Sequence, residues 1–255
     1  MINRREFLAS ATIATAGMVV PPLAIEGVSK GLAMAGGHPE DLDTLNCDWY
    51  YTWGCDPARL SDPRYVPMSR DGLLVDLPAD YSGYLLVYNE PTGQEPNGCP
   101  VTADEAAVRY RALQRSLPLA KLIMGGVSAW DCNVSGTWLK DFKRIIACLG
   151  CPKPHAYHVH GYVESWITVA NLKSWWTHQQ ATVGGRLWIS EYNDTRGNVA
   201  NLHNLTDWIK SRTWVDRYAV FTNRSNHEPW AIGDGVNLID QQGQLTASGV
   251  WYQTA

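Results

Sequence analysis

Two glutamates stand where apolar runs of the sequence end, and together they suggest a chemistry. Glu90 follows the run 84–89 and precedes Pro91, and Glu191 follows the run 187–190. If both runs are parallel strands of one closed barrel, their carboxyl ends meet at the same mouth, where the two side chains can converge. Hydrolysis of a glycosidic bond with retention needs such a pair, one carboxyl protonated and one ionised, roughly 5–5.5 Å apart. We therefore predict a glycoside hydrolase site that contains Glu90 and Glu191.

Other interpretations of these residues are weaker. A single strand-end glutamate often only caps its strand and pairs with an arginine, but a second one, and Asn89 placed to reach a sugar hydroxyl, favour catalysis. His158 and His160 share one strand face and could offer two arms of a metal site, yet only Glu164 stands nearby as a third ligand. The sequence contains neither a G-x-S-x-G nucleophile motif nor a phosphate-binding glycine loop. We expect no metal and no cofactor.

The aromatic composition points to a carbohydrate. The chain has 12 Trp and 12 Tyr but only 3 Phe, and Trp and Tyr offer a flat apolar face together with a polar group. This combination suits sugar rings, although a tryptophan-rich core would give the same composition. Trp49, Tyr51 and Trp53 alternate along the run 47–53, so we predict that they reach the barrel mouth, with Trp53 as the best stacking residue.

Short apolar runs alternate with amphipathic stretches along the chain, as in a parallel α/β protein. The strand candidates are 47–53, 65–68, 73–77, 84–89, 122–125, 156–160, 187–191 and 218–222. The helix candidates are 102–116, which opens with a capping box of Thr102 and Glu105, 135–149, 167–180 and 199–211. Eight strand candidates in one compact domain favour a (β/α)8 TIM barrel over an open sheet, and 73–77 is the weakest of them.

The first residues have the pattern of an export signal. Arg4 and Arg5 form a twin-arginine pattern, and the alanine-rich run 9–20 that follows is too short to span a membrane. We predict that residues 1–24 are a twin-arginine signal segment, that 25–43 are a linker or lead-in, and that 44–255 form the barrel domain. The protein would then be secreted or periplasmic. An uncleaved amphipathic N-terminal helix is the alternative.

Charge and cysteine content narrow the class further. A net charge of −4 does not indicate binding to nucleic acid or to an anionic membrane. No stretch other than the N-terminal run is apolar enough for a membrane span. The six cysteines form an even set that is compatible with disulfides outside the cell. Cys148 and Cys151 have C-x-x-C spacing, but they follow a helical stretch and have no second such pair, so we interpret them as structural. We expect a monomer whose partner is a polysaccharide.

The motif Asn89-Glu90-Pro91, with a second strand-end glutamate later in the chain, resembles the large clan of retaining glycosidases with (β/α)8 barrels. Within that clan the chain is similar to the compact endo-β-1,3-glucanase family 128. The matching segments occur in order between residues 49 and 218, and they are WYYTWG at 49–54, YVPM at 65–68, NEP at 89–91, VHGY at 159–162, WISEY at 188–192 and WVDRY at 214–218.

This resemblance implies roles for the site residues. The clan places its acid/base after strand four and its nucleophile after strand seven, which implies Glu90 as acid/base and Glu191 as nucleophile. Tyr162 could then hydrogen-bond Glu191 and hold it ionised. The predicted substrate-binding residues are Asn89, Trp53, Tyr51, Trp49, His160 and Tyr162.

Two positions depart from the family pattern. Gly161 stands where the family tends to have an aromatic directly after the histidine, and Val220 stands where it usually has tryptophan. We expect both positions near the sugar-binding face, where they would affect the choice of substrate rather than the reaction type.

The favoured hypothesis is thus a secreted, retaining endo-β-1,3-glucanase. A related enzyme acting on β-1,4-glucan or mannan would keep the same glutamates and differ only in the lining of its cleft. A barrel that binds carbohydrate without turnover, or a structural cell-wall protein, would have no need of two converging carboxylates.

Overall fold

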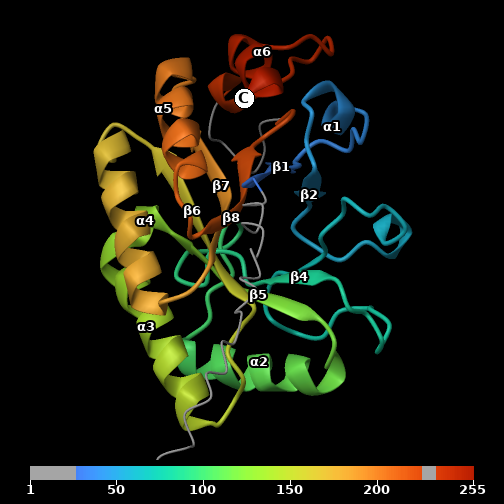
Figure 1. The fold of residues 1–255 in the computed structure, drawn as a ribbon, viewed down its shortest axis with the longest axis vertical. Helices are drawn as coiled ribbons and strands as arrows, with labels where there is room; N and C mark the ends of the chain where they lie inside the picture. The colour runs from blue at the N-terminus through green and yellow to red at the C-terminus, as the bar shows by residue number, and fades with distance from the viewer. Residues whose placement is uncertain (1–26, 226–233) are drawn as a thin grey trace, which may run out of the picture.

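The chain folds into a barrel of eight parallel strands (Figure 1). The computed structural model describes residues 27–225 and 234–255, with the side chains of 131–136 left aside. The strands are β1 (Ser29–Ala33), β2 (Trp49–Tyr51), β3 (Met68–Ser69), β4 (Tyr84–Val87), β5 (Lys121–Ser128), β6 (Ala156–Val163), β7 (Leu187–Asp194) and β8 (Val215–Phe221). Their hydrogen-bonded order is β2-β1-β8-β7-β6-β5-β4-β3. The predicted (β/α)8 fold is confirmed.

The barrel closes between β2 and the segment that leads into β3. Tyr50 of β2 forms a parallel bridge with Tyr65. The N–H of Tyr50 donates to the carbonyl of Arg64 at 3.0 Å, and the N–H of Val66 donates to the carbonyl of Tyr50 at 2.9 Å. These bonds satisfy backbone groups that would be unpaired at the edge of an open sheet.

Alternate residues of each strand face two different cores, because successive side chains of a strand point to opposite faces. In β8, Ala219 and Phe221 pack inside the barrel, whereas Tyr218 and Val220 pack against the outer helices. The inner core is rich in aromatic residues, including Trp49 and Trp188. The inner set therefore decides what reaches the mouth of the barrel.

Helices follow the strands and cover the outer face. They are α1 (Asp41–Thr44), α2 (Ala103–Ser116), α3 (Cys132–Cys148), α4 (Val169–Val183), α5 (Val199–Lys210) and α6 (Ala247–Thr254), with short 3-10 turns η1 (Pro57–Arg59), η2 (Ala129–Asp131) and η3 (Asp234–Val236). Thr102 caps α2 by accepting from the N–H of Glu105, which is one of the two hydrogen bonds of the predicted capping box, while the Glu105 carboxylate accepts from Arg109. Figure 1 shows α3, α4 and α5 side by side along one flank of the barrel.

Two predictions about the elements are wrong. Residues 29–33, assigned to the lead-in segment 25–43, form β1, which pairs with both β2 and β8. The barrel domain therefore begins before residue 44. Residues 73–77 form no strand, and the side chains of Leu73 and Leu74 are exposed. The two errors cancel in the strand count, so Glu90 follows the fourth strand and Glu191 lies in the seventh.

The remaining predictions concern the signal segment, membrane spans and disulfides. The signal segment 1–24 lies outside the described residues. In the part of the chain that the structure describes, no helix has the length and apolar character needed to cross a membrane. Cys47, Cys55, Cys99, Cys148 and Cys151 are free thiols, so none of these five forms the expected disulfides.

Candidate active site

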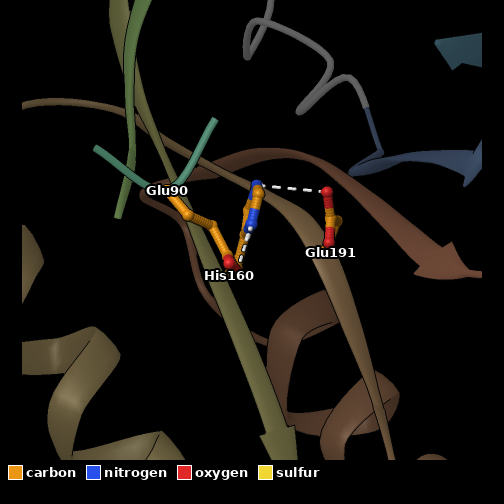
Figure 2. A group of neighbouring side chains, drawn as sticks. All are labelled: Glu90, His160 and Glu191. Carbon is orange, nitrogen blue, oxygen red and sulfur yellow. Dashed lines mark hydrogen bonds and ion pairs between the residues drawn. The ribbon is translucent and has the colours of Figure 1, made fainter. Parts of the chain in front are cut away.

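The two predicted glutamates meet at the carboxyl end of the barrel. Figure 2 shows Glu90 and Glu191 on either side of His160, which comes from β6. Glu90 reaches this point because the chain turns sharply after β4: its φ of 45° lies in the left-handed region, and its N–H donates to the carbonyl of Gly126 at 2.9 Å. Both carboxyl side chains are almost fully buried, with exposed fractions of 9% and 6%.

The two carboxylates are close enough to act on one bond. An oxygen of Glu90, an oxygen of Glu191 and a ring nitrogen of His160 all lie within 4.8 Å of one another. Retaining glycosidases hold their carboxyl groups about 5–5.5 Å apart, whereas inverting enzymes leave about 6.5–9.5 Å for a water molecule. The observed separation fits the retaining geometry.

Glu191 is surrounded by hydrogen-bond donors. Its Oε1 accepts from the hydroxyl of Tyr51 at 2.5 Å and from the indole N–H of Trp53 at 2.9 Å, and its Oε2 accepts from the hydroxyl of Tyr162 at 2.5 Å. Burial, followed by the Glu191 carboxylate, raises the pKa of both tyrosines well above the usual value, so each stays a donor. Three donors on one carboxylate hold it in a fixed orientation, as a nucleophile requires.

His160 links the two glutamates. Its Nδ1 lies 3.2 Å from Glu90 Oε1 and its Nε2 lies 3.4 Å from Glu191 Oε1, the latter without hydrogen-bond geometry. Burial opposes a charge on the ring, but the Glu191 and Glu90 carboxylates outweigh it and raise the pKa of His160. The ring therefore lies between the two carboxyl groups and contacts both, and the predicted contact of His160 with sugar stays a prediction.

His158 lies beneath His160 and stays neutral. Its Nε2 contacts the carbonyl of Val87 at 3.1 Å, and its Nδ1 contacts the hydroxyl of Ser190 at 2.9 Å. A carbonyl only accepts, so Nε2 carries the proton and Nδ1 accepts from Ser190. Burial lowers the pKa of His158 to about 3. Both ring nitrogens are thus used, and the pair of histidines is not arranged as two metal ligands.

Asn89 is held by a loop that the sequence analysis did not single out. Its amide N–H donates to the carbonyl of Asn97 at 2.7 Å, while its Oδ1 is buried without a hydrogen-bond partner among the described residues. Arg70 anchors the same loop by donating to the carbonyls of Pro96 and Gly98. The free Oδ1 is therefore fixed in place as an acceptor beside Glu90.

Aromatic side chains form the walls of the catalytic cleft. The cleft is lined by Trp53, Asn89, Glu90, Asn97, Trp130, Tyr162, Glu191 and Phe221. Trp130 and Phe221 are additions to the predicted set. Trp130 lies on η2, directly after β5, and its ring centroid is 5.0 Å from that of Tyr162. Its position just after the apolar run 122–125 is the signal that could have identified it, because residues after barrel strands face the mouth.

Trp49 does not belong to the cleft. It begins β2, so its ring lies one layer deeper in the barrel than that of Tyr51, with the two ring centroids 6.1 Å apart, and it is 1% exposed. Its ring packs edge-on against Trp188, at 5.1 Å between centroids. The prediction that Trp49 binds substrate is wrong. It took into account that the side chain points into the barrel, but not that Trp49 lies at the start of the strand, away from the carboxyl end where the mouth is.

The two departures from the family pattern, Gly161 and Val220, also lie away from the catalytic cleft. A Cβ on Gly161 would meet the ring of Trp176 on α4 at 2.9 Å, so this position faces the helices. Val220 packs in the same outer core. The residues that face the cleft in these two strands are Tyr162 and Phe221. Neither departure therefore bears on the choice of substrate by direct contact.

Comparison with known proteins agrees with this geometry. The family model described as glycosyl hydrolase catalytic core matches residues 31–252. The chain belongs to this family. It is a glycoside hydrolase, and the start of the match inside β1 agrees with the earlier beginning of the domain. None of the curated proteins matches the chain.

Several solved structures share the fold of this hydrolase. A GH128 subgroup I endo-β-1,3-glucanase from Amycolatopsis mediterranei, solved with laminaritriose, is 23% identical and has a TM-score of 0.70, with 89% of this chain and 99% of that chain covered. A subgroup III curdlan-specific exo-β-1,3-glucanase from Blastomyces gilchristii is 23% identical, with a TM-score of 0.67 and coverage of 89% and 98%. A subgroup II endo-β-1,3-glucanase from Sorangium cellulosum is 20% identical, with a TM-score of 0.66 and coverage of 89% and 98%.

Proposed function

We propose that the protein is a retaining endo-β-1,3-glucanase, with Glu90 as general acid/base and Glu191 as nucleophile. The observation that carries this proposal is the convergence of the two carboxylates within 4.8 Å at the end of an aromatic cleft. The different surroundings of the two side chains support the division of roles. Glu191 accepts from three neutral donors, whereas Glu90 lies 3.2 Å from the ring Nδ1 of His160.

In the first step, an oxygen of Glu191 attacks the anomeric carbon and the bond to the leaving oxygen breaks. Glu90 gives its proton to that oxygen, so the departing sugar leaves as an alcohol and Glu191 becomes a glycosyl ester. In the second step Glu90 takes a proton from water, the water oxygen bonds to the anomeric carbon, and Glu191 is released. The buried Oδ1 of Asn89 would accept a hydrogen bond from the sugar hydroxyl next to the reacting carbon.

The linkage is proposed from the fold and from the cleft. The similar structures named above are β-1,3-glucanases, one of them in complex with laminaritriose. Trp53, Trp130 and Phe221 provide apolar surfaces for the faces of sugar rings, and Asn97 adds a polar edge. We also propose export by the twin-arginine route, on the pattern at Arg4 and Arg5, because a polymeric glucan is met outside the cell.

The test is release of reducing ends from soluble β-1,3-glucan, with β-1,4-glucan and mannan as controls. Glu191→Gln should lower kcat by at least about a thousandfold because it removes the nucleophile. Circular dichroism and thermal unfolding should show that the variant stays folded. Full activity in Glu191→Gln would overturn the assignment of roles, and exclusive cleavage of β-1,4-glucan or mannan would overturn the proposed linkage.

A further inference from the structure

A second hollow lies next to the catalytic cleft, on the other side of η2. Trp130 lines the cleft, while the preceding residue Ala129 lines the hollow, so one short turn separates the two. The opposite wall is the loop after β6 together with α4, and it contributes Trp166 and Trp175. The hollow is open, and the space over its lining is about 900 Å³ with solvent included, against about 340 Å³ for the cleft.

The hollow has a tryptophan that the fold does not use. The side chain of Trp166 is 70% exposed, the highest fraction among the large hydrophobic residues that the structure describes. Large apolar side chains that stay in water at a concave surface mark binding sites more often than accidents of packing. The indole N–H of Trp175, in the same hollow, is buried without a hydrogen-bond partner in the described part of the chain. This N–H is inaccessible in the structure, so it is the exposed indole of Trp166 that indicates an occupant.

The lining specifies the chemistry of that occupant. Among the described residues that line the hollow there is no Asp, Glu, Lys or Arg. A charged ligand would therefore find no partner there. Besides the two indoles, Asn171, Ser174 and His178 provide hydrogen-bonding groups along α4. The Oδ1 of Asn171 already accepts from Thr168 in the capping box of α4. A purely apolar partner would cover Ser174 and His178 without hydrogen-bonding them, whereas a neutral sugar has an apolar ring face for the indole and hydroxyls for the polar side chains.

We propose that this hollow is a second polysaccharide site, which holds a strand of the β-glucan outside the catalytic cleft. The proposal rests on the proposed function for the identity of the glucan, and its own content is the separate site on α4. The position of the hollow directly beside the cleft, across η2, supports one and the same ligand for both. A long chain held at two places leaves the surface more slowly than one held at the cleft alone, because the second contact is intramolecular.

The experiment separates binding from turnover by using the Glu191→Gln background. Retardation of that protein in gels containing soluble β-1,3-glucan measures affinity without hydrolysis. Adding Trp166→Ala should weaken retardation by about tenfold, the size expected for loss of one stacking contact and its avidity. Trp166→Phe should keep most of the affinity because it keeps a ring. The matched control is Leu119→Ala, which removes another exposed apolar side chain, 59% exposed, and should change nothing.

Turnover in the active enzyme gives the second readout. Trp166→Ala should cleave a short laminari-oligosaccharide at the wild-type rate and an insoluble β-1,3-glucan several-fold more slowly. Equal losses on both substrates would place Trp166 in the catalytic cleft and overturn a separate site, as would unchanged affinity and unchanged cleavage of the insoluble glucan. A dimer in sedimentation that Trp166→Ala abolishes would show that a second copy covers the hollow, which also overturns the proposal. If the wild type cleaves no glucan, the proposed function fails, while retardation that depends on Trp166 would still support the site.

Discussion

The two ends of the barrel interior place charged groups in opposite surroundings. At the carboxyl end, Glu90 and Glu191 lie within hydrogen-bond distance of hydroxyl, indole and imidazole groups. At the other end, the guanidinium of Arg217 lies over aromatic faces, 4.7 Å from the ring centroids of Tyr84 and Trp188 and 5.5 Å from that of Trp49. Burial lowers the pKa of Arg217.

The lower end of the barrel interior thus contributes to stability, and the upper end contributes to catalysis. Cation–π contacts and apolar packing hold the lower end together. At the upper end the acidic groups are held close together, at a cost in electrostatic repulsion that the donors around Glu191 offset. Substitutions at the two ends should therefore have separable effects, and the following predictions test that separation.

The largest effect on stability is expected at the lower end. Arg217→Ala should lower the free energy of unfolding by about 3 kcal/mol, because the side chain loses three aromatic contacts and its packing against them. Arg212→Ala is the matched control: its guanidinium lies over the single ring of Trp208, at 5.1 Å, and the loss should be below about 1 kcal/mol. Denaturant unfolding measures both. A fall in kcat of the folded Arg217→Ala enzyme, with unchanged stability, would contradict the comparison.

The opposite pattern is expected at the upper end. Tyr162→Phe removes one donor from Glu191 and should lower kcat about tenfold to a hundredfold, a cost of about 1.4–2.7 kcal/mol in the transition state. Tyr192→Phe is the control, since this buried tyrosine hydrogen-bonds Thr206 on the outer face instead. It should cost about 1 kcal/mol of stability and leave kcat unchanged. Steady-state kinetics of both variants, together with their unfolding curves, decide the point.

The last prediction concerns pH. His158 has a folded pKa of about 3, below the 6.5 of a free histidine, so between these values the unfolded chain binds the extra proton. Stability should therefore fall as pH drops below about 6.5, by about 1 kcal/mol per unit. His160, whose pKa is raised, acts in the opposite direction and adds stability at low pH. His158→Gln should flatten the loss between pH 6 and pH 4, measured by denaturant unfolding, whereas exposed His155→Gln should not. An unchanged slope in His158→Gln would show that other groups cause the loss.

Much of the site could be predicted because strand ends in a parallel barrel converge. The positions of Glu90 and Glu191 follow from apolar runs and their last residues, and the contact of Tyr162 with Glu191 follows from its place on β6. The sequence did not show how far along the barrel axis each inward-facing side chain lies. Trp49 and Tyr51 share the inner face, yet only Tyr51 reaches Glu191, because two residues of strand rise separate the layers.

The missed strand has a physical explanation as well. The segment Ser29–Ala33 contains Lys30 and Gly31, which weaken its apolar pattern. The burial of both residues requires contacts with residues far away in the sequence. Lys30 is buried because its Nζ donates to the carbonyl of Tyr252 at 2.6 Å, and a Cβ on Gly31 would lie 2.3 Å from the ring of Trp49. Such contacts form only in the closed barrel, so local periodicity did not reveal them.

The central claim is that two carboxylates held within 4.8 Å cleave the glycosidic bond with retention. The most direct measurement is proton NMR of the first products released from a β-1,3-glucan, recorded before mutarotation equilibrates the anomers. Our account predicts that the new reducing ends appear first as the β-anomer, since two displacements at the anomeric carbon restore its configuration. Appearance of the α-anomer first would contradict it, because a single displacement by water would then be the mechanism.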